Sequence, residues 1–180
     1  METRESRIAA ATLPVKHLWT PWRMEYIGDK SKAENQTSCI FCQAAAQPDS
    51  DLTTNVVARS AYTFAMLNRY PYTYGHTMII PYAHVASMED MPQEALADLM
   101  MMTKGVMRAL RAIADPHGFN VGANIGEAAG AGIASHFHLH VVARWQGDAN
   151  FMVTVGGTQT VADTLSSTAR TMRENWERLT

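Results

Sequence analysis

Cysteine is scarce in this chain, and its scarcity excludes one class of protein at once. The 180 residues contain 2 cysteines, Cys39 and Cys42. A disulfide-stapled secreted domain needs several cysteine pairs, whereas a lone Cys-x-x-Cys in a reducing compartment is more typical of a metal or redox site. The two thiols therefore point to chemistry more than to a structural crosslink.

Long apolar runs and a large net charge are absent as well. No apolar run approaches the ~18 residues that a membrane-spanning helix requires, and the weak run over residues 8–15 does not make a signal peptide. The net charge of −2 gives no basic surface for nucleic acid. We therefore expect a cytoplasmic protein that binds neither a membrane nor nucleic acid.

The length predicts one domain, and the spacing of the apolar residues predicts an α+β fold. We expect a poorly ordered tail over residues 1–17 and a single domain over 18–180. Helical spacing predicts a long helix over 94–114, with Asp90 as its N-cap, and a C-terminal helix over 161–179. Alternation predicts an antiparallel sheet of about five strands, over 56–59, 62–67, 76–81, 119–124 and the histidine-rich stretch 135–144.

The long helix carries two further signals. The apolar residues expected on its core face are Leu96, Leu99, Met100, Met107, Leu110 and Ile113. Gly105 lies among them, and glycine inside a helix costs ~1 kcal/mol relative to alanine. Its presence therefore indicates close packing at that position.

Three of the histidines stand at every second position, as His136, His138 and His140. Alternation is the period of a β-strand, so the three imidazoles are expected to share one face, with Phe137 and Leu139 on the other. A strand whose polar face happens to be histidine is the alternative. Imidazoles in a row contribute little stability but suit metal binding, acid–base catalysis or nucleophilic attack. The pattern therefore favours a functional site.

A small, Gly-rich stretch over residues 126–132 directly precedes the histidines. Glycine lets backbone N–H groups approach an anion closely and cradle phosphate oxygens, although a plain turn would use the same residues. Beside three imidazoles, the stretch favours phosphorus chemistry, in which an imidazole nitrogen attacks phosphorus and forms a phosphoramidate.

Metal binding is the alternative role for the same histidines. Cys39 and Cys42 supply two thiolates, and a tetrahedral zinc site needs two more ligands. His84 and one histidine of the triad could complete such a site. A redox dithiol, with His84 as an ordinary surface residue, is the alternative.

At this point the chain resembles a known family. His136 to Val142 is similar to the signature of the histidine triad (HIT) superfamily, in which three histidines alternate with apolar residues. Asn68, the segment 75–77, the long helix, Asn124 and the Gly-rich turn follow in the order of that family. The segments 18–23 and 147–152 resemble a bacterial branch related to fragile-histidine-triad hydrolases and diadenosine tetraphosphate phosphorylases. The resemblance extends from residue 18 to the C-terminus.

The resemblance implies roles for the histidines and for the substrate-binding residues. His138, the middle histidine, is expected to be the nucleophile, with His140, His76 and His136 as the further catalytic histidines. Asn68 is expected at the ribose, and the phosphates are expected to contact Asn124, Gly130, Gly132, Ser135 and Asn150. Asn124 stands where the fragile-histidine-triad branch has a glutamine, so hydrolysis and phosphorolysis both remain open.

The resemblance also implies a metal and an assembly. Zinc-carrying members of the family bind their metal through residues that correspond here to Cys39, Cys42, His84 and His136. We therefore expect a structural zinc that braces the catalytic strand, with no organic cofactor. A homodimer is expected too, with the sheet extended across the subunit boundary.

The expected function is cleavage of a dinucleoside polyphosphate, diadenosine tetraphosphate or triphosphate, through a nucleotidyl-histidine intermediate. The partners are then a nucleotide substrate and, if the cleavage is phosphorolytic, inorganic phosphate. Three alternatives stay open: a nucleoside phosphoramidate hydrolase of the same superfamily, a metal-dependent hydrolase, and a nucleotide-binding regulatory protein.

Overall fold

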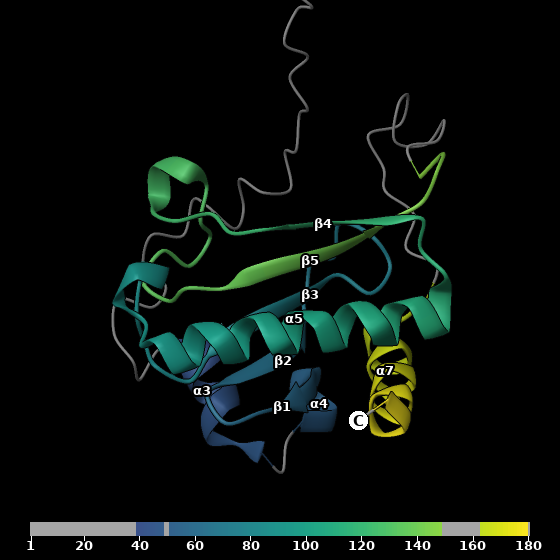
Figure 1. Ribbon diagram of the computed structural model, residues 1–180, viewed down its shortest axis with the longest axis horizontal. Helices are drawn as coiled ribbons and strands as arrows, with labels where there is room; N and C mark the ends of the chain where they lie inside the picture. Colours follow the sequence, from purple (N-terminus) through teal and green to yellow (C-terminus); the bar gives the residue numbers. More distant parts are fainter. Residues whose placement is uncertain (1–38, 49–50, 149–162, 180) are drawn as a thin grey trace, which may run out of the picture.

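The computed structural model describes residues 39–48, 51–148 and 163–179, and Figure 1 draws the elements they form. The expected tail over 1–17 lies outside these residues. The helices are α3 (Ile40–Ala46), α4 (Asp51–Thr54), α5 (Gln93–Ala114) and α7 (Leu165–Leu179), with short 3-10 turns η2 (Met88–Asp90) and η3 (Glu127–Ala129). The strands are β1 (Val56–Arg59), β2 (Thr63–Leu67), β3 (Thr77–Pro81), β4 (Gly118–Gly122) and β5 (Leu139–Arg144).

The five strands form one antiparallel sheet in the order β1-β2-β3-β5-β4, which confirms the predicted fold class. β1 and β2 make a hairpin, in which the backbone N–H of Ser60 donates to the carbonyl of Thr63. In β5, His140 pairs with Met78 of β3 on one side and with Gly122 of β4 on the other. The sheet therefore places His140 between two strands that are distant in sequence.

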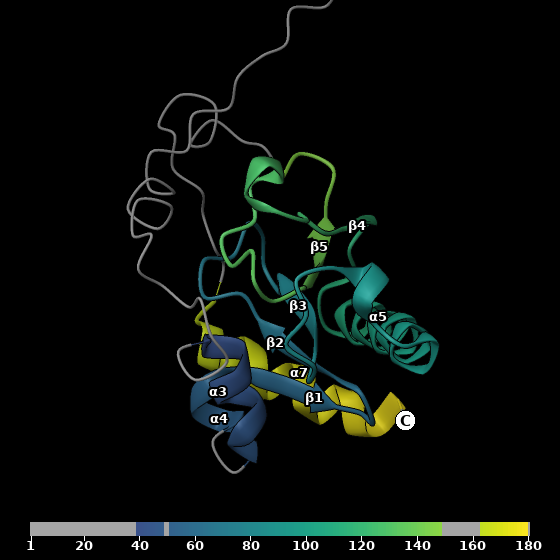
Figure 2. The same ribbon diagram turned by 90° about the vertical axis from the view of Figure 1, so that its left-hand side faces the viewer.

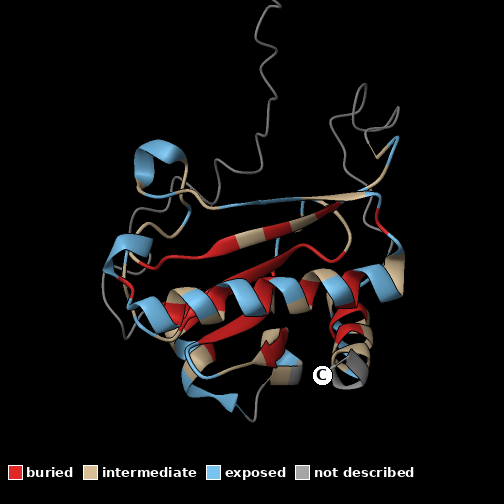
Figure 3. Ribbon diagram, in the orientation of Figure 1, coloured by how far each residue is buried: buried red, intermediate tan, exposed pale blue. Residues whose placement is uncertain are grey.

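Helices cover the two faces of the sheet unequally. The long helix α5 lies across one face, with α7 beside it (Figure 1), and the short helix α3 lies on the opposite face (Figure 2). Phe137, Leu139 and Val141 are buried in the core beneath α5. Phe41 and Met78 belong to the smaller core under α3. Burial follows this division, since α5 shows an exposed outer side and a buried inner side in Figure 3.

The histidine-rich strand begins later than the sequence predicts. β5 starts at Leu139 rather than at residue 135. Its register with β3 ends where Ile79 pairs with Leu139, and continuing it would set residue 137 against Pro81, which has no N–H to donate. The N–H of Phe137 instead donates to the carbonyl of Val85, at an N···O distance of 2.6 Å. His136, which lies at a bend, and His138 therefore come just before the strand.

The start and the apolar face of the long helix also differ from the prediction. Pro92, and not Asp90, occupies the N-cap position of α5, because Asp90 is the last residue of the preceding 3-10 turn. Met100 lies on the outer side of α5, where 58% of its surface is exposed. Leu99 and Leu110 are buried as predicted.

The close packing expected at Gly105 is present. A Cβ atom at this position would overlap the indole ring of Trp176 on α7. We expect Gly105→Ala to lower the free energy of unfolding by ~1–3 kcal/mol, since the steric overlap outweighs the ~1 kcal/mol gain in helix propensity. Chemical denaturation measures the change. Lys104→Ala, at the exposed neighbouring position, is the control and should be close to neutral; equal stability of the two variants would contradict the packing argument.

Among the described residues, no helix is both long enough and apolar enough to cross a membrane.

Candidate active site and metal centre

His138 presents one ring nitrogen in a state suited to nucleophilic attack. Its Nδ1 lies 2.9 Å from the backbone carbonyl oxygen of His136, so Nδ1–H is the donor in this contact. The neutral ring then has no proton on Nε2. The ring contacts that of Phe41, at a centroid distance of 5.1 Å, and that of His140, at 5.0 Å.

His76 and His140 form a hydrogen-bonded pair beside His138, although 64 residues separate them in sequence. The backbone N–H of Tyr72 donates to His76 Nδ1 at 3.1 Å, so neutral His76 carries its proton on Nε2. That proton is donated to His140 Nδ1, with 2.9 Å between the nitrogens. His140 must then hold its own proton on Nε2, which makes this atom a hydrogen-bond donor.

The loop before β3 fixes the position of His76. Gly75 adopts a φ of +71°, which glycine reaches without strain, and a Cβ here would overlap Leu110 of α5. The hydroxyl of Thr73 donates to the carbonyl of Ala143 at 2.9 Å, which ties the loop to β5. The Gly-His sequence is therefore held from both the helix and the sheet.

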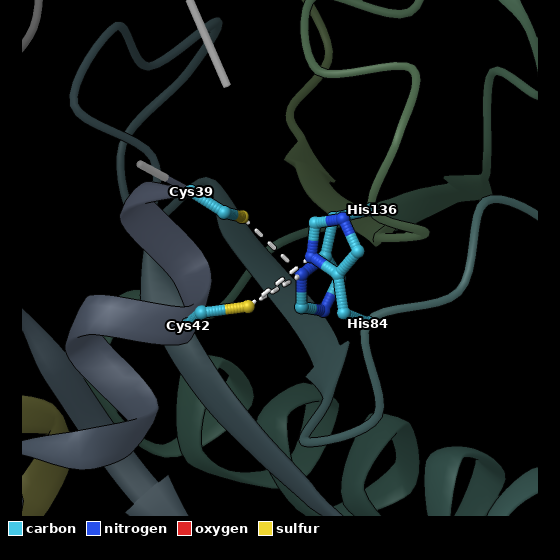
Figure 4. Close-up of side chains that lie close together, drawn as sticks. All are labelled: Cys39, Cys42, His84 and His136. Atoms are coloured by element: carbon cyan, nitrogen blue, oxygen red, sulfur yellow. Dashed lines mark hydrogen bonds between the residues drawn. The ribbon is translucent and has the colours of Figure 1, made fainter. Parts of the chain in front are cut away.

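Cys39, Cys42, His84 and His136 converge on one point (Figure 4), and their candidate ligand atoms all lie within 4.8 Å of one another. Cys39 Sγ is 3.3 Å from His136 Nδ1, and Cys42 Sγ is 3.2 Å from His84 Nδ1. α3 supplies Cys42 and the N-cap residue Cys39, while the loop after β3 supplies His84.

This donor set fits a tetrahedral zinc ion. Zn–S bonds of ~2.3 Å and Zn–N bonds of ~2.0 Å place the ligand atoms ~3.3–3.8 Å apart, close to the shorter separations in the cluster. The Nε2–H of His136 donates to the carbonyl of Pro81 at 2.9 Å, which leaves Nδ1 as the nitrogen that faces the thiols. Both ring nitrogens of His136 are thus engaged, which favours the ligand role over the catalytic role.

Burial shifts the pKa values of the site. Desolvation lowers the pKa of His76 to about 3, with repulsion from His140 and His138 as further causes. Desolvation also lowers the pKa of His138, opposed by its hydrogen bond to the His136 carbonyl. The pKa of Cys42 is raised to about 11 by desolvation and by the neighbouring Cys39. His76 and His138 are therefore neutral at physiological pH, and a metal must displace the proton of the Cys42 thiol.

The low pKa of His76 makes the stability of the protein depend on pH. Below a pH of ~6.5 the unfolded chain protonates this histidine, whereas the folded protein does so only near its pKa of about 3. The free energy of unfolding is therefore expected to fall as the pH decreases from ~6.5, by up to ~1.4 kcal/mol per pH unit from this proton. Denaturant titrations at several pH values measure this dependence. In His76→Gln the free energy of unfolding should decrease less steeply with falling pH than in the parent protein.

The matched control is His117→Gln, which removes an exposed histidine outside the site. It should keep the pH slope of the parent protein. Equal slopes for both variants would contradict the assignment of that proton to His76, which is faced by His140, His138, Tyr72 and Asn68.

The structure brings some of the expected substrate residues to the site. Asn68 Nδ2 lies 3.5 Å from His76 Nδ1, so this side chain borders the histidine pair. Asn124 donates to the carbonyl of Gly130, which has a φ of +86° at the end of η3. Gly132 and Ser135 lie between η3 and His136. Asn150 lies outside the described residues, as does the segment 18–23.

Three contributions to the site were missed in the sequence. Phe41 contacts His138, the Tyr72 ring packs 4.4 Å from that of His76, and the Pro81 carbonyl orients His136. The position of Phe41 in the sequence, between the two predicted metal ligands Cys39 and Cys42, could have indicated that its ring lies at the site. Backbone groups such as the Pro81 carbonyl give no signal in a residue pattern.

The fold and the site define a class of histidine-dependent enzymes: the Nδ1–H of His138 donates to a backbone carbonyl, its Nε2 is unprotonated, and a hydrogen-bonded histidine pair lies beside it on a five-stranded sheet. A family model described as "HIT domain" matches residues 49–147, more than half of the chain. The chain therefore belongs to the HIT family, and it is a nucleotide-processing enzyme of that family.

Two curated relatives of this chain carry the names of different activities. AP-4-A phosphorylase of Mycobacterium tuberculosis is 39% identical over 170 residues, which span 91% of this chain and 86% of the relative. Adenosine 5'-monophosphoramidase hnt1 of Schizosaccharomyces pombe is 31% identical over 105 residues, 58% of this chain and 73% of the relative.

Solved structures of the family have the same fold. A Zn-bound histidine triad family protein from Mycobacterium smegmatis superposes with a TM-score of 0.65 at 27% identity, covering 81% of this chain and 97% of that one. A HIT family protein from Bacillus subtilis gives a TM-score of 0.55 at 29% identity, covering 70% and 82%.

Proposed function

We propose that this enzyme cleaves diadenosine tetraphosphate by phosphorolysis through a nucleotidyl-His138 intermediate. The observation that carries the proposal is the tautomer of His138, whose Nδ1–H is held by the His136 carbonyl so that Nε2 is bare. The 39% identity to AP-4-A phosphorylase, which extends over 91% of this chain, favours this substrate and phosphate as the second reactant.

In the first step, His138 Nε2 attacks the α-phosphorus of one adenylate. A P–N bond forms, and the bond from the α-phosphorus to the bridging oxygen breaks, so ATP leaves with the electron pair of that bond. In this scheme the Nε2–H of His140 donates to a phosphate oxygen, where it stabilises the charge that develops. His76 keeps this proton on Nε2 of His140 by donating to His140 Nδ1.

In the second step, an oxygen of inorganic phosphate attacks the same phosphorus. The P–N bond breaks, the electron pair returns to His138 Nε2, and ADP is released. Splitting the displacement in two lets one histidine serve both halves of the reaction. Water in place of phosphate would give AMP, so the two outcomes differ only in the second nucleophile.

The substrate contacts carry over as proposals from the resemblance. We assign Asn68 to the ribose, and its place beside His76 supports this. The phosphate contacts are assigned to Asn124, Gly130, Gly132, Ser135 and Asn150. The link between Asn124 and the Gly130 carbonyl supports a shared place for two of them.

Zinc is proposed to be structural. Cys39, Cys42, His84 and His136 would hold it, and when bound it supplies a crosslink between α3 and the chain that leads to His138. Four protein ligands complete a tetrahedral shell and leave no position for a water nucleophile. The donor set therefore argues against the alternative of a metal-dependent hydrolase.

A homodimer is proposed from the free edge of the sheet. β4 is the last strand, its outer residues 120–122 are exposed, and no other strand of the described chain pairs with that edge. A second copy could continue the sheet there. Light scattering that gives the monomer mass at micromolar concentration would rule this out.

The experiment that tests the function is one incubation with diadenosine tetraphosphate, with and without inorganic phosphate, with products separated by chromatography. ATP plus ADP formed only with phosphate is the expected result. ATP plus AMP in both samples would make the enzyme a hydrolase. An adenosine phosphoramidate in parallel tests the activity named for the yeast relative, and tight nucleotide binding without any product would identify a regulatory protein.

A further inference from the structure

Phe41 has an unusual position in the site. It lies between Cys39 and Cys42 on α3, and only 1% of its surface is exposed. Its ring contacts the His136 ring edge-on at 5.4 Å and the His138 ring at 5.1 Å. One apolar side chain thus touches both the candidate metal ligand and the candidate nucleophile.

His138 depends on such a contact. The torsion that rotates an imidazole about its Cβ–Cγ bond has broad energy wells. A half-turn of the ring would move Nδ1 away from the His136 carbonyl and displace Nε2. The hydrogen bond restrains the ring from one end. The rings of Phe41, at an interplanar angle of 53°, and of His140, at 72°, contact the imidazole and restrain its rotation.

Phe41 is itself held firmly. Its ring belongs to the small buried core under α3, together with Val56 and Ile80. The guanidinium of Arg59 on β1 donates to the carbonyl of Ala44 at 2.7 Å, near the C-terminal end of α3. The two cysteines fix the other end of the helix at the metal-ligand cluster. The ring is thus anchored to the sheet independently of the substrate.

We propose that Phe41 is a positioning residue that holds the His138 ring in the tautomer and orientation needed for attack on phosphorus. The kinetic part of the proposal rests on the function proposed above. Phe41→Leu keeps an apolar side chain but loses the flat ring that touches His138. A small displacement of the nucleophile is costly, so kcat is expected to fall by ~10- to 100-fold, with KM within twofold of the parent.

The chain offers a matched control in Phe64→Leu. Phe64 is equally buried in the same core, but its ring stacks on Tyr82 at 5.5 Å rather than on a histidine. Both variants should lose similar thermal stability and keep the metal content of the parent, and only Phe41→Leu should lose kcat. Equal kcat in the two variants, a raised KM at unchanged kcat, or a kcat loss that follows metal loss would overturn the proposal.

A second readout does not need the substrate. Nitrogen NMR of the imidazole rings, with His138 assigned through His138→Asn, reports which nitrogen carries the proton. The parent and Phe64→Leu should show His138 protonated at Nδ1 alone, and Phe41→Leu should add the Nε2–H form. An unchanged tautomer in Phe41→Leu refutes the proposal, whereas a parent enzyme that cleaves no dinucleotide refutes only the proposed function.

Discussion

Replacing His138 with alanine is expected to lower kcat by at least ~10⁴-fold, because the reaction then has no nucleophile to form the covalent intermediate. The neighbouring histidines cannot substitute. His140 Nδ1 accepts the proton of His76, and both nitrogens of His136 are engaged with the Pro81 carbonyl and the thiols. The measurement is kcat with diadenosine tetraphosphate and phosphate, together with intact-mass detection of the nucleotidyl-enzyme.

The control for this variant is His117→Ala. The imidazole of His117 accepts the N–H of Gln146 at 2.8 Å, in the turn after β5, and takes no part in the site. It should leave kcat within about twofold. If folded His138→Ala retained kcat within ~100-fold of the parent, the covalent mechanism would be wrong, and direct attack by phosphate or water would replace it.

Replacing Cys39 with serine is expected to abolish metal binding and to destabilise the fold. A zinc ion present at ~1,000 times its dissociation constant stabilises the folded state by ~4 kcal/mol. For a chain of this length that corresponds to a fall of ~10 °C in Tm. Cys39 is completely buried, so water cannot replace its thiolate as a metal ligand. Elemental analysis and thermal unfolding measure the two effects.

Chelation provides the comparison that assigns the effect to the metal. A strong chelator should lower the Tm of the parent to that of Cys39→Ser and leave the variant itself unchanged. Ala44→Ser places a hydroxyl at another buried position of α3 and should keep both its metal and its response to the chelator. The chelated protein is expected to keep residual activity well below its Tm, since the proposed zinc would brace the site without taking part in the reaction. If the chelated parent protein is metal-free by elemental analysis but its Tm is unchanged, the proposed structural role of the metal is wrong.

Much of the fold could be predicted because its signals are local. The alternation of Phe137, Leu139 and Val141 with the histidines requires two faces, and the sheet with α5 provides them. Gly105 in a helix has a cost that only close packing explains, and Trp176 is the residue it packs against. The start of β5 was missed because it depends on Pro81, which opposes residue 137 only once the two strands are paired.

The sequence by itself determined which residues are the candidates for the chemistry: the histidine triad, the two cysteines and the Gly-His sequence before β3. Their identities and spacings decide what they can bind or attack. Only the tertiary structure decided which nitrogen of each ring is available. The carbonyls of His136 and Pro81 and the N–H of Tyr72 determine which ring nitrogen carries the proton. Backbone groups set a histidine tautomer only once the fold brings them within hydrogen-bond distance.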